Sequence, residues 1–145
     1  MENLHPVFVH FPVALLLTSC GIEAAALALK RSAWHRVSIW NLALGTIGAA
    51  AAVVTGRMAQ ETAKHTFEIH QVMSLHEKLG YVVLGLCSAV LAWRLLRKDR
   101  LKTAYRWLAW GLLLAACGVM VFSAHLGGRL VYEFGVGGIY GRPKL

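Results

Sequence analysis

The sequence predicts an all-α fold, an integral membrane four-helix bundle that runs up-down-up-down with both termini on the non-cytoplasmic side. Three observations lead there. Hydrophobic residues make up 57% of the 145 residues and mean hydropathy is +0.55, above the range of soluble domains. Four apolar stretches are long enough to cross a hydrocarbon core of roughly 30 Å at about 1.5 Å per residue. The basic residues gather in two short connections between those stretches, which is a topology signal.

We expect one transmembrane domain over residues 1–145, because the chain has room for little more. Each apolar stretch becomes a helix, since backbone polar groups in lipid must be satisfied within the segment. The expected helices cover residues 6–29, 36–58, 75–97 and 104–127. Residues 59–74 are mixed polar and should form an external loop or a short interfacial helix. Residues 128–145 are glycine-rich and should form an extended C-terminal tail.

The first apolar stretch is expected to stay in the mature protein as a membrane helix. Pro6 suits the first position of a helix, and Pro12 lies near enough to the start to remove few hydrogen bonds. Glu2 is the only early charge, and no small-residue cleavage site follows the apolar run. These features do not match a secretory signal.

Orientation follows from the two basic turns. Nine of the fifteen Lys and Arg lie in or beside them: Lys30, Arg31, Arg36, Arg94, Arg97, Lys98, Arg100, Lys102 and Arg106. The positive-inside rule therefore makes both turns cytoplasmic and both termini external. All five tryptophans flank the same turns, as an interfacial belt does. The net charge of +8 is thus a membrane signal, and we expect no nucleic-acid partner.

Three histidines are expected to share one depth near the outer end of the bundle. His10, His76 and His125 each lie a few residues from the outer end of a different predicted helix, and His5 lies further out. Ionisable groups inside membranes are expensive and tend to mark functional sites. Histidine is a common axial ligand of membrane haems. We therefore predict that at least two of the three bind haem b, with structural hydrogen bonding as the alternative.

Small and basic residues near these histidines fit the same prediction. Gly80 lies one turn from His76, and Gly118 lies seven residues before His125, so both could leave flat space for a porphyrin. Arg57 and Arg129 are placed to meet its propionates near the aqueous edge. Close helix packing by small residues is the competing interpretation for the glycines.

Other chemistries are less well supported by the residue pattern. His10, His76 and His125 could instead form a Zn or Cu site with an open fourth position. A His-Glu-x-x-His motif is absent from the sequence, which disfavours hydrolysis. Three single cysteines, Cys20, Cys87 and Cys117, form no Cys-x-x-Cys pair and should be small core residues; the compartment does not follow from them.

The remaining polar residues of interest are one acid and three histidines. Glu23 is the one acid well inside a predicted span and should pair with Arg36, Arg94 or Arg106 near the basic turns, with a proton path as the sharper alternative. His35, His65 and His70 have polar neighbours and should be solvated.

Several motifs resemble the bacterial membrane family known as domain of unknown function 2231. They are His5-Pro6-Val7-Phe8-Val9-His10-Phe11-Pro12, Thr55-Gly56, His76-Glu77-Lys78-Leu79-Gly80, and His125-Leu126-Gly127-Gly128-Arg129-Leu130-Val131-Tyr132 with Gly135-Val136-Gly137. The resemblance implies a multi-pass bacterial inner-membrane protein with periplasmic termini, whose relatives occur beside Rieske or cytochrome c modules. It also carries His10, His76 and His125 over as haem ligands. The chain has Ala124 where the resemblance leads us to expect a glycine and Phe134 where it leads us to expect another histidine. If the family's site uses that histidine, its loss here favours one haem over two.

The function expected from these features is electron transfer by a membrane b-type cytochrome-like protein. Its partners would be membrane lipid, quinol and a periplasmic cytochrome c or Rieske protein, in a homo- or hetero-oligomer. If the protein catalyses a reaction, electron transfer is favoured over hydrolysis. The alternatives are a non-catalytic subunit that packs against a larger respiratory or photosynthetic complex, and a His-based Zn or Cu site for metal handling.

Overall fold

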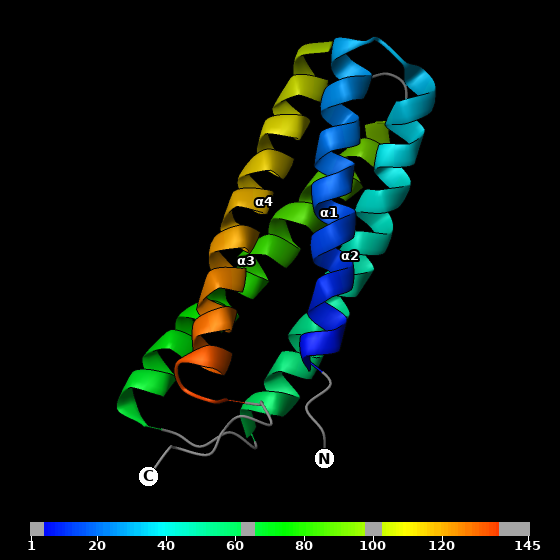
Figure 1. The fold of residues 1–145 in the computed structure, drawn as a ribbon. Helices are drawn as coiled ribbons and strands as arrows, with labels where there is room; N and C mark the ends of the chain where they lie inside the picture. The colour runs from blue at the N-terminus through cyan, green and yellow to red at the C-terminus, as the bar shows by residue number, and fades with distance from the viewer. Residues whose placement is uncertain (1–4, 62–65, 98–102, 137–145) are drawn as a thin grey trace.

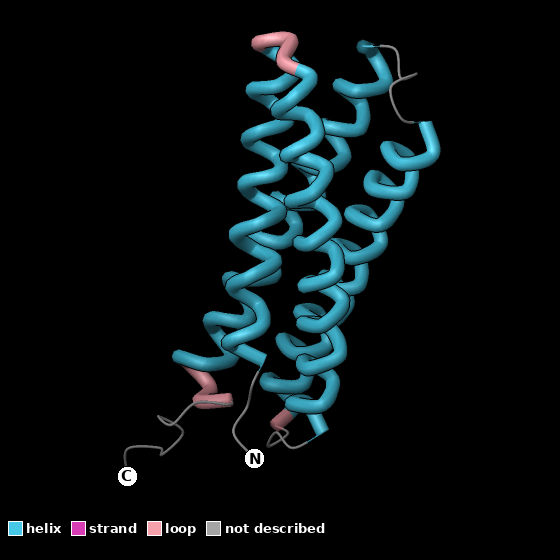
Figure 2. Tube along the Cα trace, turned by 90° about the vertical axis from the view of Figure 1, so that its right-hand side faces the viewer, coloured by secondary structure: helices cyan, strands magenta, loops and turns pink. Residues whose placement is uncertain are grey.

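Four long helices make up nearly all of the structure (Figures 1 and 2). The computed structural model describes residues 5–61, 66–97 and 103–136. Its helices are α1 (His5–Ala28), α2 (Ser32–Glu61), α3 (Phe67–Arg97) and α4 (Thr103–Tyr132). Those three ranges contain no strand, which confirms the all-α prediction. All four helices are apolar and long enough to cross a membrane.

The helices run up-down-up-down, as predicted. Helix α1 packs mainly against α2, and α3 packs mainly against α4. The resulting hairpins meet through α2 with α3 and α1 with α4, so α1 and α3 occupy one diagonal. The basic segments lie at one end of the bundle, which is called the basic end below. The start of α1 and the end of α4 lie together at the opposite end, called the histidine end (Figure 1).

Close backbone approach fixes the α1–α2 hairpin. A Cβ atom added to Gly45 would lie 2.8 Å from Leu16 Cδ2, and one added to Gly48 would lie 3.0 Å from a ring carbon of Phe11. Only glycine lets the two helices pack this closely, as small residues do at membrane helix interfaces. Pro12 also packs on Gly48, so α1 continues through the proline without losing this contact.

Polar and apolar side chains are distributed as a bilayer requires. Outward-facing side chains include large exposed hydrophobics such as Ile47, Val54 and Val121. Among the described residues, the fully or nearly fully buried polar side chains include Ser19, Glu23, Ser38, Thr46, Arg94 and Ser123. A surface of exposed hydrophobic side chains is unfavourable in water but favourable in lipid. Polar groups are costly in lipid, so they are buried inside the bundle, where they can bond to one another.

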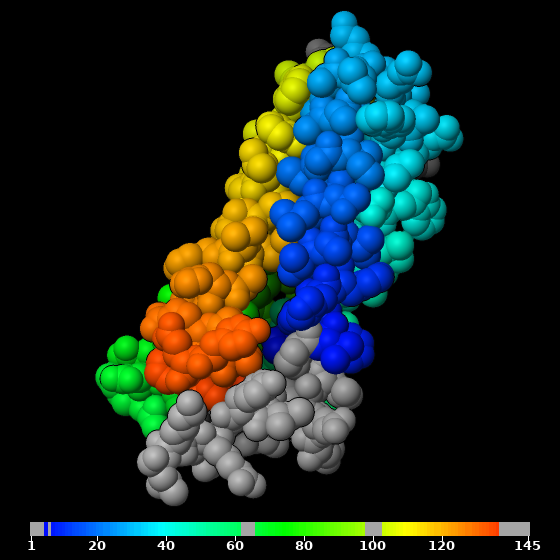
Figure 3. All heavy atoms as spheres, in the orientation of Figure 1, coloured from blue at the N-terminus to red at the C-terminus, as the bar shows by residue number. Residues whose placement is uncertain are grey.

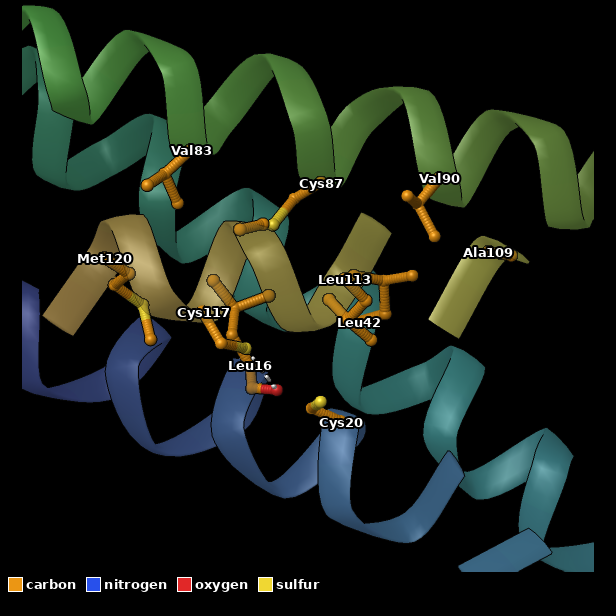
Figure 4. Packing of buried hydrophobic residues seen from close by; sticks show 11 residues of the cluster. Leu16, Cys20, Leu42, Val83, Cys87, Val90, Ala109, Leu113, Cys117 and Met120 are labelled. Carbon is orange, nitrogen blue, oxygen red and sulfur yellow. Dashed lines mark hydrogen bonds between the residues drawn. The ribbon is translucent and has the colours of Figure 1, made fainter. Parts of the chain in front are cut away.

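An apolar core separates the two ends of the bundle. It contains side chains from all four helices, and Figure 4 shows them: Leu16, Cys20, Leu42, Val83, Cys87, Val90, Ala109, Leu113, Cys117 and Met120. The three cysteines are buried free thiols in this core, as expected from their apolar neighbours.

Of the two expectations for residues 59–74, the helical one fits the described residues better than the external loop, although the helices there are continuous with the spans. Helix α2 continues to Glu61, and α3 begins at Phe67; residues 62–65 lie outside the described ranges. The Thr66 hydroxyl accepts a hydrogen bond from the Ile69 backbone N–H at 3.4 Å, which caps the helix start. Ile69 and Met73 lie one turn apart and are buried against Leu130. The helical spacing of Ile69 and Met73 and the Thr66 cap therefore favour a helix here, despite the polar composition of the segment.

The expected extended tail from residue 128 is wrong over its first part. Helix α4 continues to Tyr132, and Gly135 then takes a left-handed conformation with φ of 66°. The chain turns back there, and the Val136 N–H donates to the Leu130 carbonyl at 2.8 Å. Phe134 and Val136 cover the Ile69 cluster, so apolar burial organises this segment. Residues 137–145 lie outside the described ranges.

Candidate functional site

Two histidines from the diagonal helices meet at the histidine end. The rings of His5 on α1 and His76 on α3 have centroids 6.2 Å apart and stand nearly perpendicular, at 80°. Both side chains are partly buried. His5 was expected further out than His76, where it could cap the site or bind a second centre.

Each imidazole of the pair is oriented by an oxygen atom on a neighbouring helix. His76 Nδ1 lies 2.8 Å from the Ser123 carbonyl oxygen on α4, and since a carbonyl only accepts, Nδ1 carries the proton. His5 Nδ1 lies 3.2 Å from Thr55 Oγ1 on α2. Thr55 donates its own proton to the carbonyls of Ala51 and Ala52, so it accepts from His5. Hydrogen bonds of this kind fix the tautomer and direction of functional histidines.

Glycines provide the space that these two rings occupy. A Cβ on Gly56 would lie 3.0 Å from His5 Cε1, and a Cβ on Gly127 would lie 3.2 Å from His76 Cε1. His5 precedes the apolar span Val7–Ala28. Burial, and after it the neighbouring His76, lower the pKa of His5 and favour its neutral form. The pair is thus packed and oriented, and its burial favours the neutral form of His5.

The other two predicted ligands lie apart from the pair. His10 and His125 are both exposed on the outside of their helices. Within residues 5–61, 66–97 and 103–136, no group of three or more His, Cys, Asp and Glu side chains could hold a metal ion. The structure therefore does not bring His10, His76 and His125 together, and a ligand role for His10 or His125 stays a prediction.

The arginines and glycines that were predicted to contact haem also have other neighbours in the structure. Arg57 is exposed and donates to the Tyr81 hydroxyl at 3.2 Å, and Arg129 Nε donates to Glu133 at 2.9 Å. Gly118 is exposed, with nothing within 4 Å of an added Cβ, whereas Gly80 meets only Val53 at 3.7 Å. A polar cavity of about 350 Å³ next to Arg57 is lined by Gln60, Glu61 and Glu77 as well.

A second polar layer lies at the basic end. The fully buried carboxylate of Glu23 on α1 accepts from His35 Nδ1 on α2, at 2.7 and 2.8 Å, and lies 3.3 Å from Arg94 Nη1 on α3. The prediction that Glu23 pairs with one of three arginines is confirmed for Arg94. His35 was expected to be solvated, and that is wrong, because its ring turns inward to Glu23.

Serine hydroxyls extend this second layer across the α1–α2 hairpin. Ser19 Oγ donates to the Ser38 carbonyl at 2.8 Å, and Ser38 Oγ donates to the Ser19 carbonyl at 3.0 Å. Arg94 Nη1 also lies 3.3 Å from Ser38 Oγ. Buried polar groups in lipid need such partners, so the layer joins three helices.

A sequence signal for His35 existed. Glu23 and His35 lie six residues before and after Leu29, next to the tight turn that joins α1 to α2. Residues equidistant from the turn of an antiparallel hairpin face each other at similar depth. Thr66 likewise carried a sequence signal, because threonine before an apolar helical pattern is a common N-cap residue. No comparable spacing rule predicts His5 with His76, because α1 and α3 are not sequence neighbours.

The donor chemistry of the histidine pair suits haem, but its packing does not. Two imidazoles with anchored Nδ1 atoms resemble axial ligands with their supporting hydrogen bonds. A porphyrin between them needs a flat slot, yet the rings lie against each other and fill the spaces beside Gly56 and Gly127. A ligand that approaches the ring edges from the side fits this arrangement better.

The two hairpins are separated on one side of the bundle. Figure 3 shows a hollow between α1 and α4 toward the histidine end, with green atoms of the chain at its floor. Helix α1 contacts α4 least of all its neighbours, in keeping with this separation. The apolar core closes the bundle beyond it.

The fold and the site together define a multi-pass helical membrane protein with a polar layer at each end. The model of a family described as a predicted membrane protein, domain of unknown function 2231, matches residues 1–139. The chain belongs to that family, as its motifs indicated. Neither a curated protein nor a solved structure matches the chain.

Proposed function

We propose that the protein is a quinol-binding membrane subunit in which the His5–His76 pair receives the polar head group of the quinol. One observation carries the proposal: His76 Nδ1 donates to the Ser123 carbonyl. In a neutral imidazole with a protonated Nδ1, Nε2 is a hydrogen-bond acceptor. A buried acceptor of fixed direction at a membrane site selects a ligand that offers an O–H group.

This chemistry distinguishes the two redox forms of a quinone. A quinol has hydroxyl groups that donate to Nε2, whereas a quinone has carbonyl oxygens that only accept and would face another acceptor. Leaving a buried acceptor unmatched costs about 1–3 kcal/mol. We therefore expect the site with neutral His76 to bind the reduced form at least about fivefold more tightly.

The route and the membrane context support a lipid-soluble ligand. The hollow between α1 and α4 opens toward the side of the bundle, from which a ligand dissolved in the bilayer arrives. The apolar core beyond it, which includes Val83, Cys117 and Met120, would halt the head group at the histidine layer. Onward electron transfer to a periplasmic cytochrome c or Rieske protein remains part of the proposal.

Binding of a short-chain ubiquinol and its quinone to the protein in lipid nanodiscs tests this function. In His76→Asn the amide nitrogen replaces Nδ1 and keeps the bond to Ser123, while the acceptor at Nε2 is lost. We expect this variant to stay folded and to lose the preference for quinol. His10→Asn is the matched control, because His10 is exposed on α1. Equal affinity of the unaltered protein for both forms would refute the proposal.

Haem b is the second candidate, supported by the donor set alone. Both imidazoles are anchored through Nδ1, as axial ligands are. Binding would require α1 and α3 to separate at the histidine end. Protein purified from membranes would then show a Soret band that His76→Ala abolishes. A colourless protein that still binds quinol would exclude haem and leave the first proposal standing.

The proposed orientation puts the histidine end at the periplasmic face of a bacterial inner membrane. Support comes from Lys30, Arg31, Arg36 and Arg97, which all lie at the opposite end. Alkaline phosphatase fused to the C-terminus should be active, and a fusion within the α1–α2 turn should not. The reverse pattern would overturn the orientation.

A non-catalytic subunit of a larger complex stays as the alternative function. Its test is copurification: stoichiometric partners together with no quinol binding would favour it.

A further inference from the structure

Buried Arg94 has more hydrogen-bond donors than the protein satisfies. Its side chain is 1% exposed, and only Nη1 has acceptors, Glu23 Oε2 and Ser38 Oγ, each at 3.3 Å. Neither Nε nor Nη2 finds a partner among the described residues. An unmatched buried donor is costly, and more so on a charged group. Arg94 therefore has donors for an acceptor that the described residues do not supply.

A second arginine faces the same region from α4. Arg106 Nε is also buried without a partner in the described part of the chain. Arg94 and Arg106 lie equally far from the centre of the connection between α3 and α4, and they are close enough to repel each other. Arg106 is only partly buried, so its side chain extends from the interior to the surface.

The charges of this cluster do not balance. Among the described residues, the Glu23 carboxylate pairs with Arg94, and Arg106 adds a second guanidinium close to Arg94. These described groups carry surplus positive charge whichever form His35 takes. Positive charge in a low-dielectric interior requires a counter-charge. The ligand must therefore be an anion that accepts several hydrogen bonds.

We propose that Arg94 and Arg106 together bind one phosphate-type oxyanion at the basic end of the bundle. Guanidinium donors match the spaced oxygens of a phosphate group and bind it through paired hydrogen bonds. The oxyanion reaches Arg106 at the surface and is then next to the unmatched donors of Arg94. Its source is either the phosphodiester of an anionic phospholipid or free phosphate.

Native mass spectrometry of the full chain in mild detergent tests the lipid source. Phosphatidylglycerol and phosphatidylcholine of equal chain length are offered at equal concentration. We expect one phosphatidylglycerol per chain, retained about tenfold better than phosphatidylcholine. Arg106→Gln should remove this preference. Arg97→Gln is the matched control, because Arg97 is an exposed arginine on the last turn of α3 and should change retention less than about twofold.

Phosphorus NMR with inorganic phosphate tests the other source, using protein in nanodiscs made of phosphatidylcholine alone. Line broadening that Arg106→Gln abolishes would assign the site to free phosphate. The double variant Glu23→Gln with Arg94→Gln removes both deeply buried charges together and should lose binding of either ligand while remaining folded.

Two results would overturn the proposal. The first is no preference for phosphatidylglycerol together with no effect on phosphate, which would leave internal water as the partner of the unmatched donors. The second is an equal loss in Arg97→Gln and Arg106→Gln, which would mean diffuse attraction to a basic surface.

Discussion

Replacing Glu23 by glutamine tests whether a buried carboxylate holds the basic end together. The substitution keeps the shape of the side chain and one oxygen to accept from His35, but it removes the charge that faces Arg94 at 3.3 Å. Glu23 is 0% exposed and Arg94 is 2% exposed, so water cannot compensate for the lost charge. Removing one member of a buried ion pair costs about 3–5 kcal/mol.

The double variant Glu23→Gln with Arg94→Gln separates the ion pair from general packing. With both charges gone, no uncompensated ion remains, and we expect stability within about 1–2 kcal/mol of the unaltered protein. Unfolding by sodium dodecyl sulfate in mixed micelles, followed by circular dichroism, measures all three proteins. A loss below about 1 kcal/mol in Glu23→Gln, or additive losses in the double variant, would refute the reasoning.

Two further substitutions test packing, both measured in the same unfolding assay. Gly45→Ala should cost about 1–3 kcal/mol, because its Cβ would lie 2.8 Å from Leu16 on α1. Gly118→Ala, with open space around it, should cost nothing, and an equal loss in both would contradict the proposed α1–α2 contact. Ser19→Ala removes the donor to the Ser38 carbonyl and should cost about 0.5–1 kcal/mol; no loss would show that the serine pair is dispensable.

Hydrophobic runs predicted the helices well where the membrane dictates their length and less well outside it. Helix α3 begins at Phe67 because Ile69 and Met73 pack on Leu130 outside the most apolar stretch. The same cluster holds Phe134 and Val136. Local composition could not predict either result, because the burial depends on residues that lie far away in the sequence.

The two polar layers differ in how far the sequence could predict them. Of the two partners of Glu23, His35 lies across the short α1–α2 turn, and Arg94 belongs to the basic residues at the same end of the bundle. Spacing along the sequence therefore limits the partners of Glu23 to a few candidates. His5 and His76 belong to diagonal helices whose meeting depends on how the two hairpins dock. That docking also turned His10 and His125 outward, because a rotation about a helix axis decides which side chains face the interior.

By itself, the sequence determined that the chain crosses a membrane four times as antiparallel helices with its basic turns at one end. Hydropathy, helix length and charge are local quantities, and the bilayer imposes the rest. Only the tertiary structure decided which imidazoles pair and which donors of Arg94 stay unmatched. Those outcomes depend on the angle and rotation of helices that pack through glycines and buried side chains, and such geometry has no local signature.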